Sequence, residues 1–267
     1  MKDILAQIVI DKKKDLVFQK EFFPLSALKN TANFVGNQRS LKQLLNAKKR
    51  GVIAEYKRRS PSKQDINLEA NINTIVPGYA RAGAVAVSVL TNLKYFGGTN
   101  RDLVAARSLV EIPILRKDFM VDPYQIYESK ALGADVVLLI AAILTPKEIK
   151  EMAGLAHQLG LEVLLEVHNE EELDRSFCPE IDFVGVNNRN LKTFEVSIQT
   201  SLDLLAQLPK DVLTLSESGL ANELDVQTLS EAGFNGFLIG ETFMKTANPE
   251  EACGKMVRAL ANMKKAC

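Results

Sequence analysis

A carboxylate and an ammonium group follow the first strongly apolar run of the chain. In the segment VIAEYK, Glu55 and Lys57 are two residues apart, so both side chains lie on one face of an extended strand. The opposite face is left to Val52, Ala54 and Tyr56. A charged pair in the middle of a core costs free energy, so we expect this pair where the strand ends. There the two groups could exchange protons with a substrate.

Polar side chains recur at the same place in later apolar runs. Lys117 ends ILRK, Glu166 lies near the end of LEVLLEV, and Glu217 ends VLTLSE. The run VGVNNRN adds Asn187 and Arg189 on a common side. Cations among several glutamates are suited to proton transfer on a carbonyl or hydroxyl group and to holding a substrate carboxylate. If the strands are parallel neighbours, all these side chains converge on one mouth.

Eight short aliphatic or β-branched runs must position these residues, and helical segments separate them. The runs are VIAEYK, VAVSVL, IPILRK, DVVLLIA, LEVLLEV, DFVGVN, VLTLSE and GFLIG. Such alternation is typical of parallel βαβ units. No linker rich in Pro, Gly or Ser divides the chain, so we predict a single domain over residues 1–267.

The positions of the glycine-bearing turns distinguish a closed barrel from an open sheet. A doubly wound sheet usually has a glycine-rich phosphate turn after its first strand, but the first turn here, KRRSPSK, has no glycine. Glycines follow the seventh and eighth runs, where (β/α)8 barrels bind phosphate. We therefore predict an α/β fold, a (β/α)8 TIM barrel over residues 50–267. The expected phosphate-binding residues are Ser60, Ser218, Gly219, Gly240 and Glu241.

Residues 1–49 precede the first strand and read as an N-terminal helical extension of two or three helices. Its lysine run, Lys12 to Lys14, is most simply a solvated helix face.

Later in the chain, Asn169 with Glu172 three residues on indicates a capping box at a helix start. The two histidines, His157 and His168, are too few for a histidine-based metal site, and we expect both on the surface or behind a site.

Composition excludes several classes of protein. The chain has 33 Lys and Arg residues and 33 Asp and Glu residues, so its formal net charge is zero. Such a protein has no overall electrostatic attraction to a polyanion, and we expect no nucleic-acid partner. No apolar run approaches the ~20 residues of a membrane helix, and we expect no membrane contact. Three distant cysteines, Cys178, Cys253 and Cys267, favour a reducing, cytoplasmic location without disulfides or metal. A monomer is the working expectation for the assembly.

Seven segments together resemble the indole-3-glycerol-phosphate synthase family, over about residues 52–244. They are AEYKRRSPS, SVLTNLKYFGG, ILRKDFMVDPYQI, LLEVHNEEEL, VGVNNRNLKTFEV, SESGL and FLIGETFM. The resemblance implies conversion of 1-(2-carboxyphenylamino)-1-deoxyribulose 5-phosphate to indole-3-glycerol phosphate, carbon dioxide and water in tryptophan biosynthesis. It also implies a small phosphorylated carboxylate as substrate and no metal or organic cofactor.

The resemblance implies catalytic roles for four residues. Lys117 is similar to the general acid that polarises the substrate ketone, and Lys57 to the lysine that contacts the carboxylate and helps expel the hydroxyl. Glu166 and Glu55 correspond to the acid/base carboxylates.

Further residues are implied to bind the substrate. Asn187 and Arg189 resemble groups that hold the intermediate, and Glu217 lies where the family keeps a third glutamate near the substrate hydroxyls. Phe96 and Phe119 fall where aromatic residues face the anthranilate ring.

Three alternatives stay open from the sequence. Another phosphate-binding barrel, such as phosphoribosylanthranilate isomerase or the tryptophan synthase α-subunit, would lack the lysine of LRKDF and the EYK pair. A nucleic-acid-binding barrel would use Arg58, Arg59 and Lys63, which a synthase would instead place on a loop that closes over a doubly anionic substrate. A catalytically silent scaffold would not need the charged strand ends.

Overall fold

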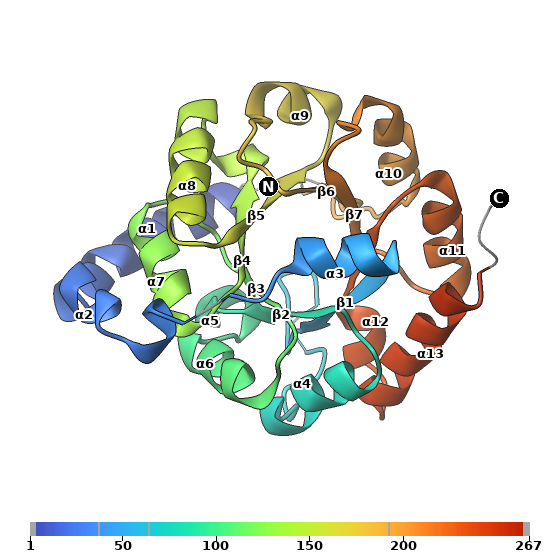
Figure 1. Cartoon of the computed structure of the whole chain (residues 1–267), viewed down its shortest axis with the longest axis horizontal. Helices are drawn as coiled ribbons and strands as arrows, with labels where there is room; N and C mark the ends of the chain where they lie inside the picture. Colours follow the sequence, from blue (N-terminus) through green and yellow to red (C-terminus); the bar gives the residue numbers. More distant parts are fainter. Residues whose placement is uncertain (1–3, 37, 64, 192, 264–267) are drawn as a thin grey trace.

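Eight parallel strands close into a barrel in the order β1 to β8, and helices form an outer layer around it (Figure 1). The computed structural model describes residues 4–36, 38–63, 65–191 and 193–263. All eight predicted strands are present, and the predicted (β/α)8 barrel is confirmed. The strands are β1 (Gly51–Tyr56), β2 (Ala86–Leu90), β3 (Ile114–Lys117), β4 (Val136–Ile140), β5 (Glu162–Val167), β6 (Phe183–Asn187), β7 (Leu213–Glu217) and β8 (Gly236–Ile239).

The helices that follow the strands cover the outside of the barrel. The longer ones are α4 (Ile72–Arg81), α6 (Asn100–Leu109), α7 (Tyr124–Leu132), α8 (Pro146–Gln158), α9 (Glu170–Ser176), α10 (Gln199–Leu204), α11 (Glu223–Ala232) and α13 (Pro249–Ala261). Short elements add α5 (Leu93–Phe96), α12 (Glu241–Met244), η2 (Ala141–Ile143) and η3 (Leu205–Gln207). None of the helices within the described ranges is long and apolar enough to cross a bilayer.

Alternation along each strand divides the core into two layers. Val52, Ala54 and Tyr56 of β1 pack outward under the helices, whereas Ile53 joins the cluster inside the barrel, as its parity predicts. The register places strand ends side by side, since Asn187 of β6 pairs with Glu217 of β7. The inner cluster is therefore apolar at mid-barrel and gives way to charge at the carboxyl ends of the strands.

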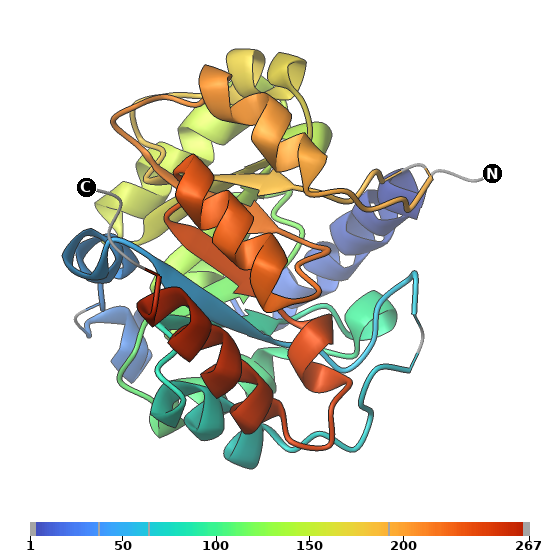
Figure 2. The same cartoon turned by 90° about the vertical axis from the view of Figure 1, so that its right-hand side faces the viewer.

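The N-terminal extension contacts both ends of the barrel. It contains α1 (Ile4–Phe22), α2 (Leu25–Lys29), η1 (Ala32–Phe34) and α3 (Leu41–Lys48). Leu41 and Leu45 of α3 are fully buried in the inner cluster and close the amino-terminal end of the barrel. Figure 2 shows α1 and α3 at opposite ends, with α1 beside the loops that follow the strands.

The expectation of a solvated lysine run is wrong for Lys12. Its side chain is buried, and its Nζ lies 2.8 Å from Oδ1 of Asp118, directly after β3. Lys13 and Lys14 are exposed, as expected. The reason lies in the tertiary structure. Helix α1 lies across the end of β3, so Lys12 faces the buried carboxylate of Asp118.

The capping box predicted at α9 forms only in part. Asn169 accepts a hydrogen bond from the backbone N–H of Glu172, as an N-cap residue does. The Glu172 carboxylate, however, accepts a hydrogen bond from the backbone N–H of His168 at 2.8 Å instead of one from that of Asn169.

Of the three cysteines, Cys178 and Cys253 are free, and Cys267 lies outside the described residues.

Candidate active site

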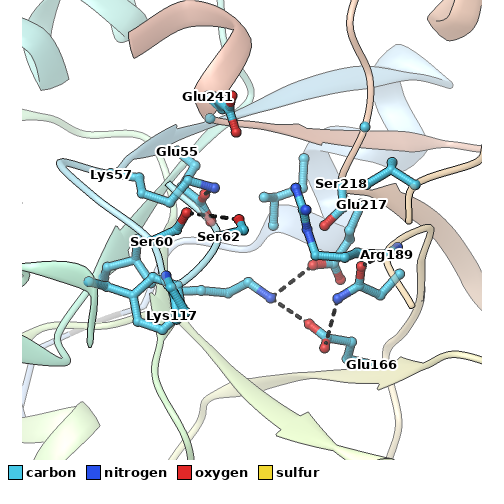
Figure 3. A pocket seen from close by; sticks show the side chains of 18 of the residues that line it. Glu55, Lys57, Ser60, Ser62, Lys117, Glu166, Arg189, Glu217, Ser218 and Glu241 are labelled. Atoms are coloured by element: carbon cyan, nitrogen blue, oxygen red, sulfur yellow. Dashed lines mark hydrogen bonds and ion pairs between the residues drawn. The ribbon is translucent and has the colours of Figure 1, made fainter. Parts of the chain in front are cut away.

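A cavity of about 430 Å³ opens at the carboxyl ends of the strands. Every residue that the sequence singles out for the site contributes to its wall, and Figure 3 shows ten of the lining side chains labelled. From the sequence-predicted set the wall contains Glu55, Lys57, Ser60, Phe96, Lys117, Phe119, Glu166, Asn187, Arg189, Glu217, Ser218, Gly219, Gly240 and Glu241. Residues from five strands and several loops, far apart in sequence, therefore share one chamber.

Lys117 lies at the centre of this chamber between two carboxylates. Its Nζ is 2.6 Å from Oε2 of Glu166 and 2.9 Å from Oε2 of Glu217 (Figure 3). Burial opposes its positive charge, but Glu166, Glu217 and Glu55 outweigh that effect and raise the pKa of Lys117 above its ordinary value. Lys117 is therefore an ammonium group with a proton to donate.

The two carboxylates beside Lys117 differ in their affinity for a proton. Glu166 also accepts a hydrogen bond from Nδ2 of Asn187 at 3.1 Å. Burial would raise the pKa of Glu166, but the charge of Lys117, with that of His168, holds it below the usual range. Burial, aided by the charge of Glu166, raises the pKa of Glu217 to about 7 against the attraction of Lys117. This asymmetry separates a base from a carboxyl group that can hold a proton.

Glycine makes room for Glu217. A Cβ at Gly185 on the neighbouring strand would lie 2.2 Å from Oε1 of Glu217, so a larger residue would displace the carboxylate. That same Oε1 is buried and has no hydrogen-bond partner within the described residues. It is thus available to a substrate hydroxyl.

A second ion pair lies across the chamber. Oε1 of Glu55 is 2.7 Å from Nζ of Lys57, and Glu55 is buried while Lys57 is half-buried. A Cβ at Gly240 would lie 2.5 Å from Oε1 of Glu55, so glycine is needed here for a second reason besides its backbone N–H. The pair lies at the strand end, as its spacing in the sequence predicts.

The loops after β7 and β8 form the other side of the cavity. Ser218 and Gly219 both have positive φ angles, 67° and 72°, and a Cβ on Gly219 would lie 2.0 Å from Cγ1 of Val196. α12 begins at Glu241, so its first N–H groups have no partner within the helix. Ser60 lies in the same wall, with its Oγ 3.2 Å from Oγ of Ser62. Backbone donors and hydroxyls gathered in this way suit an anion.

Two aromatic rings stand together in the wall. The centroids of Phe96 and Phe119 are 6.0 Å apart, with their planes tilted by 37°. They offer an apolar surface to a flat ring opposite the polar loops.

The family model for indole-3-glycerol phosphate synthase matches residues 5–256. The indole-3-glycerol phosphate synthase of Bacteroides thetaiotaomicron is 48% identical over 260 residues, 97% of this chain and 100% of that protein. The corresponding enzyme of Chromobacterium violaceum is 44% identical over 96% of this chain and 98% of its own length. The chain belongs to the indole-3-glycerol phosphate synthase family. It is thus a carboxy-lyase of tryptophan biosynthesis, and the resemblance seen in the sequence is confirmed.

Solved structures with low sequence identity share the fold. The crystal structure of tryptophan synthase subunit alpha from Legionella pneumophila has a TM-score of 0.60 at 12% identity, covering 84% of this chain and 97% of that chain. Thiamine phosphate pyrophosphorylase from Pyrococcus furiosus has a TM-score of 0.58 at 14% identity, covering 83% and 98%. At such low sequence identity, these structural similarities support the barrel fold and no shared activity.

Sequence reasoning missed the contribution of the extension to this synthase-family site. Ile4, Leu5 and Ile8 of α1 line the cavity. The apolar run ILAQIV was a visible signal for a buried face, but nothing in it indicates which part of the barrel it meets. Leu138 and Ile140 of β4 also line the cavity, and their parity in VVLLI would have identified them.

The basic residues after β1 are paired within the protein. The Arg58 guanidinium donates to the carbonyl of Gly97 and forms an ion pair with Asp102 at 2.6 Å. Arg59 donates to the backbone carbonyls of Leu93 and Lys94, at 2.6 and 2.9 Å. Neither arginine lines the cavity, whereas Ser60, Pro61 and Ser62 of the same loop do. They tie the loop after β1 to the loop after β2.

Proposed function

We propose that this chain closes the indole ring of 1-(2-carboxyphenylamino)-1-deoxyribulose 5-phosphate with Lys117 as the general acid. The observation that carries the proposal is the position of the Lys117 ammonium between Glu166 and Glu217 at the centre of the cavity. A buried cation that keeps its proton can give it to a ketone oxygen as negative charge develops there.

The steps follow from the groups available. The ring carbon that bears the carboxylate attacks the ketone carbon, and the ketone oxygen takes a proton from Lys117. Carbon dioxide then leaves, and the electron pair of the broken bond restores the aromatic ring. Lys57 protonates the new hydroxyl, which leaves as water. Glu166 and Glu55 act as the carboxylates in this step. They take the proton lost from the neighbouring CH₂ group and return protons to the lysines.

The remaining residues of the wall bind the substrate in this proposal. The phosphate lies on the loops after β7 and β8 with Ser60, because backbone donors gather there. The anthranilate ring packs on Phe96 and Phe119, and Arg189 with Asn187 holds the carboxylate and the intermediate. We further propose that the protein acts in the cytoplasm as a monomer.

Turnover tests the proposal directly. Purified protein incubated with the carboxyphenylamino-deoxyribulose phosphate should develop indole fluorescence, and Lys117→Ala should abolish it. Normal turnover by Lys117→Ala would overturn the role of this lysine, whereas absence of product from the unaltered protein over a range of pH would overturn the proposed reaction.

Replacement of Glu166 separates chemistry from binding. Glu166→Gln keeps the shape of the side chain but removes its charge, so kcat should fall by about 10²-fold or more while KM changes little. A rise in KM with unchanged kcat would assign Glu166 to substrate binding instead.

A further inference from the structure

His168 stands directly behind Glu166. Its Nε2 lies 3.7 Å from Oε1 of Glu166, and its Nδ1 lies 3.0 Å from Oε2 of Glu172 on α9. The His168 side chain is only 11% exposed. Glu172 fixes the ring from the far side, and the buried Nε2 has no hydrogen-bond partner in the part of the chain that the structure describes. The ring therefore points an unused nitrogen at a carboxylate of the active site.

His168 and Glu172 also line a second cavity, of about 640 Å³. Most residues in its wall have polar side chains, and Asn187 and Arg189 belong to its wall and to that of the first cavity. Glu166 lines only the first cavity, whereas His168 and Glu172 line only the second. The row Glu172, His168, Glu166 therefore leads from one cavity to the other.

The reaction in the proposed function, on which this inference rests, consumes one proton per turnover. A carboxylate leaves as neutral carbon dioxide and a ketone oxygen leaves as water, so one negative charge disappears. The lysines give two protons to that oxygen, and a carboxylate recovers one from the CH₂ group. The remaining proton must come from solvent.

We propose that His168, held by Glu172, carries this proton from the second cavity to Glu166. The His168 imidazolium gives its Nε2 proton to Oε1 of Glu166 after a small rotation brings the two atoms from 3.7 Å to about 2.8 Å. Glu166 passes a proton through Oε2 to Nζ of Lys117, 2.6 Å away. His168 is then a neutral imidazole that keeps its Nδ1 proton, hydrogen-bonded to Glu172. It becomes an imidazolium again when the ring turns back and Nε2 takes a proton from solvent in the second cavity, whose wall it forms.

The charges around His168 favour this role. Glu172 faces the ring from α9, Glu166 from β5 and Glu217 from β7, whereas Arg189 shares the wall of the second cavity. Burial opposes the imidazolium, but the Glu172 hydrogen bond and the charge of Glu166 raise the pKa of His168 above its ordinary value. Imidazolium is thus available close to neutral pH.

The matched test compares the two histidines of the chain. His168→Gln should lower kcat about tenfold or more at pH 8 while KM stays within about twofold, because a proton route is lost and no substrate contact is. Added imidazole, which can enter the second cavity, should restore much of that kcat. His157→Gln, on α8 with its Nε2 2.9 Å from Asp182, is the control and should leave kcat unchanged.

A second variant guards against misfolding of the first. Glu172→Gln retains an acceptor for the His168 ring and backbone but removes the negative charge that favours the His168 imidazolium, so it should lower kcat at pH 8 in the same direction. A wild-type kcat and pH profile in His168→Gln, or a loss of kcat that imidazole does not restore in either variant, would overturn the relay. The turnover of Glu166→Gln distinguishes failure of the relay from failure of the proposed function. Full turnover in this variant would contradict the proposed role of Glu166, whereas a loss of turnover in this variant alone would contradict only the relay.

Discussion

At the residue scale, burial and charge give similar side chains different chemistry. Glu166 and Glu217 both contact Lys117, yet the pKa of Glu166 is lowered and that of Glu217 is raised. Burial opposes the charge of both groups, but Lys117, His168 and Asn187 outweigh it at Glu166. At Glu217 the charge of Glu166 adds to the effect of burial, and Oε1 has no hydrogen-bond donor within the described residues. One lysine can therefore be flanked by a base and by a carboxyl group near its titration point.

The raised pKa of Glu217 makes stability depend on pH. The pKa rises from 4.5 to about 7 on folding, so this group favours the folded state when protonated, and the contribution is lost as pH rises between those values. Increasing pH from 5 to 8 should therefore lower the free energy of unfolding of the wild type by about 2 kcal/mol more than that of Glu217→Gln. Denaturant unfolding at the two pH values measures this difference.

An exposed carboxylate provides the control for that comparison. Glu69→Gln, on the surface before α4, should show the same pH dependence as the wild type. Equal pH dependence in Glu217→Gln and the wild type would contradict the raised pKa.

At the element scale, α1 is part of the active site and not an appendage. It contributes Ile4, Leu5 and Ile8 to the cavity, and Lys12 joins it to Asp118, the neighbour of Lys117. Asp118 also accepts a hydrogen bond from Thr91 at 2.6 Å. The extension is thus attached at the strand end that carries the general acid in our proposal.

Replacement of Lys12 tests that attachment. Lys12→Met keeps the apolar stem but leaves Asp118 buried without its closest cation, so the free energy of unfolding should fall by about 3 kcal/mol. KM should rise as well, because α1 lines the cavity. Lys13→Met, one residue further along the helix at an exposed position, should change stability by no more than about 0.5 kcal/mol. Equal effects of the two substitutions, measured by thermal unfolding, would contradict a role for the buried pair.

At the scale of the whole molecule, charge is balanced and the basic loop is paired internally. Lys+Arg 33 and Asp+Glu 33 leave no net field, and Arg58 and Arg59 donate to neighbouring loops. Lys63 lies 3.3 Å from Glu241. A polyanion would therefore have to compete with existing contacts for the same cations.

We accordingly expect no polynucleotide binding. A labelled single-stranded oligonucleotide should show no saturable change in anisotropy up to about 100 µM protein at 150 mM salt, since non-specific binders reach dissociation constants of about 10⁻⁴ to 10⁻⁶ M. Tight binding that weakens steeply with salt, and that disappears when Arg58, Arg59 and Lys63 are changed to Gln, would contradict this expectation.

The sequence by itself determined the strands and the faces of their side chains. A period of two residues separates Glu55 and Lys57 from Val52 and Ala54, whatever the rest of the chain does. The count of eight runs and the late glycine turns then indicated a barrel, and the carboxyl ends of barrel strands meet in one place. Local periodicity and one topological rule were therefore enough to gather the site residues.

Only the tertiary structure decided which of these groups touch. The burial of Lys12, the pairing of Arg58 with Asp102, and the position of His168 behind Glu166 each join residues from different elements. Such contacts depend on the packing angle of helices and on the path of loops, which no local pattern encodes. The electrostatic difference between Glu166 and Glu217 has the same origin, because a pKa is set by every charge and dipole near a group and not by its neighbours in sequence.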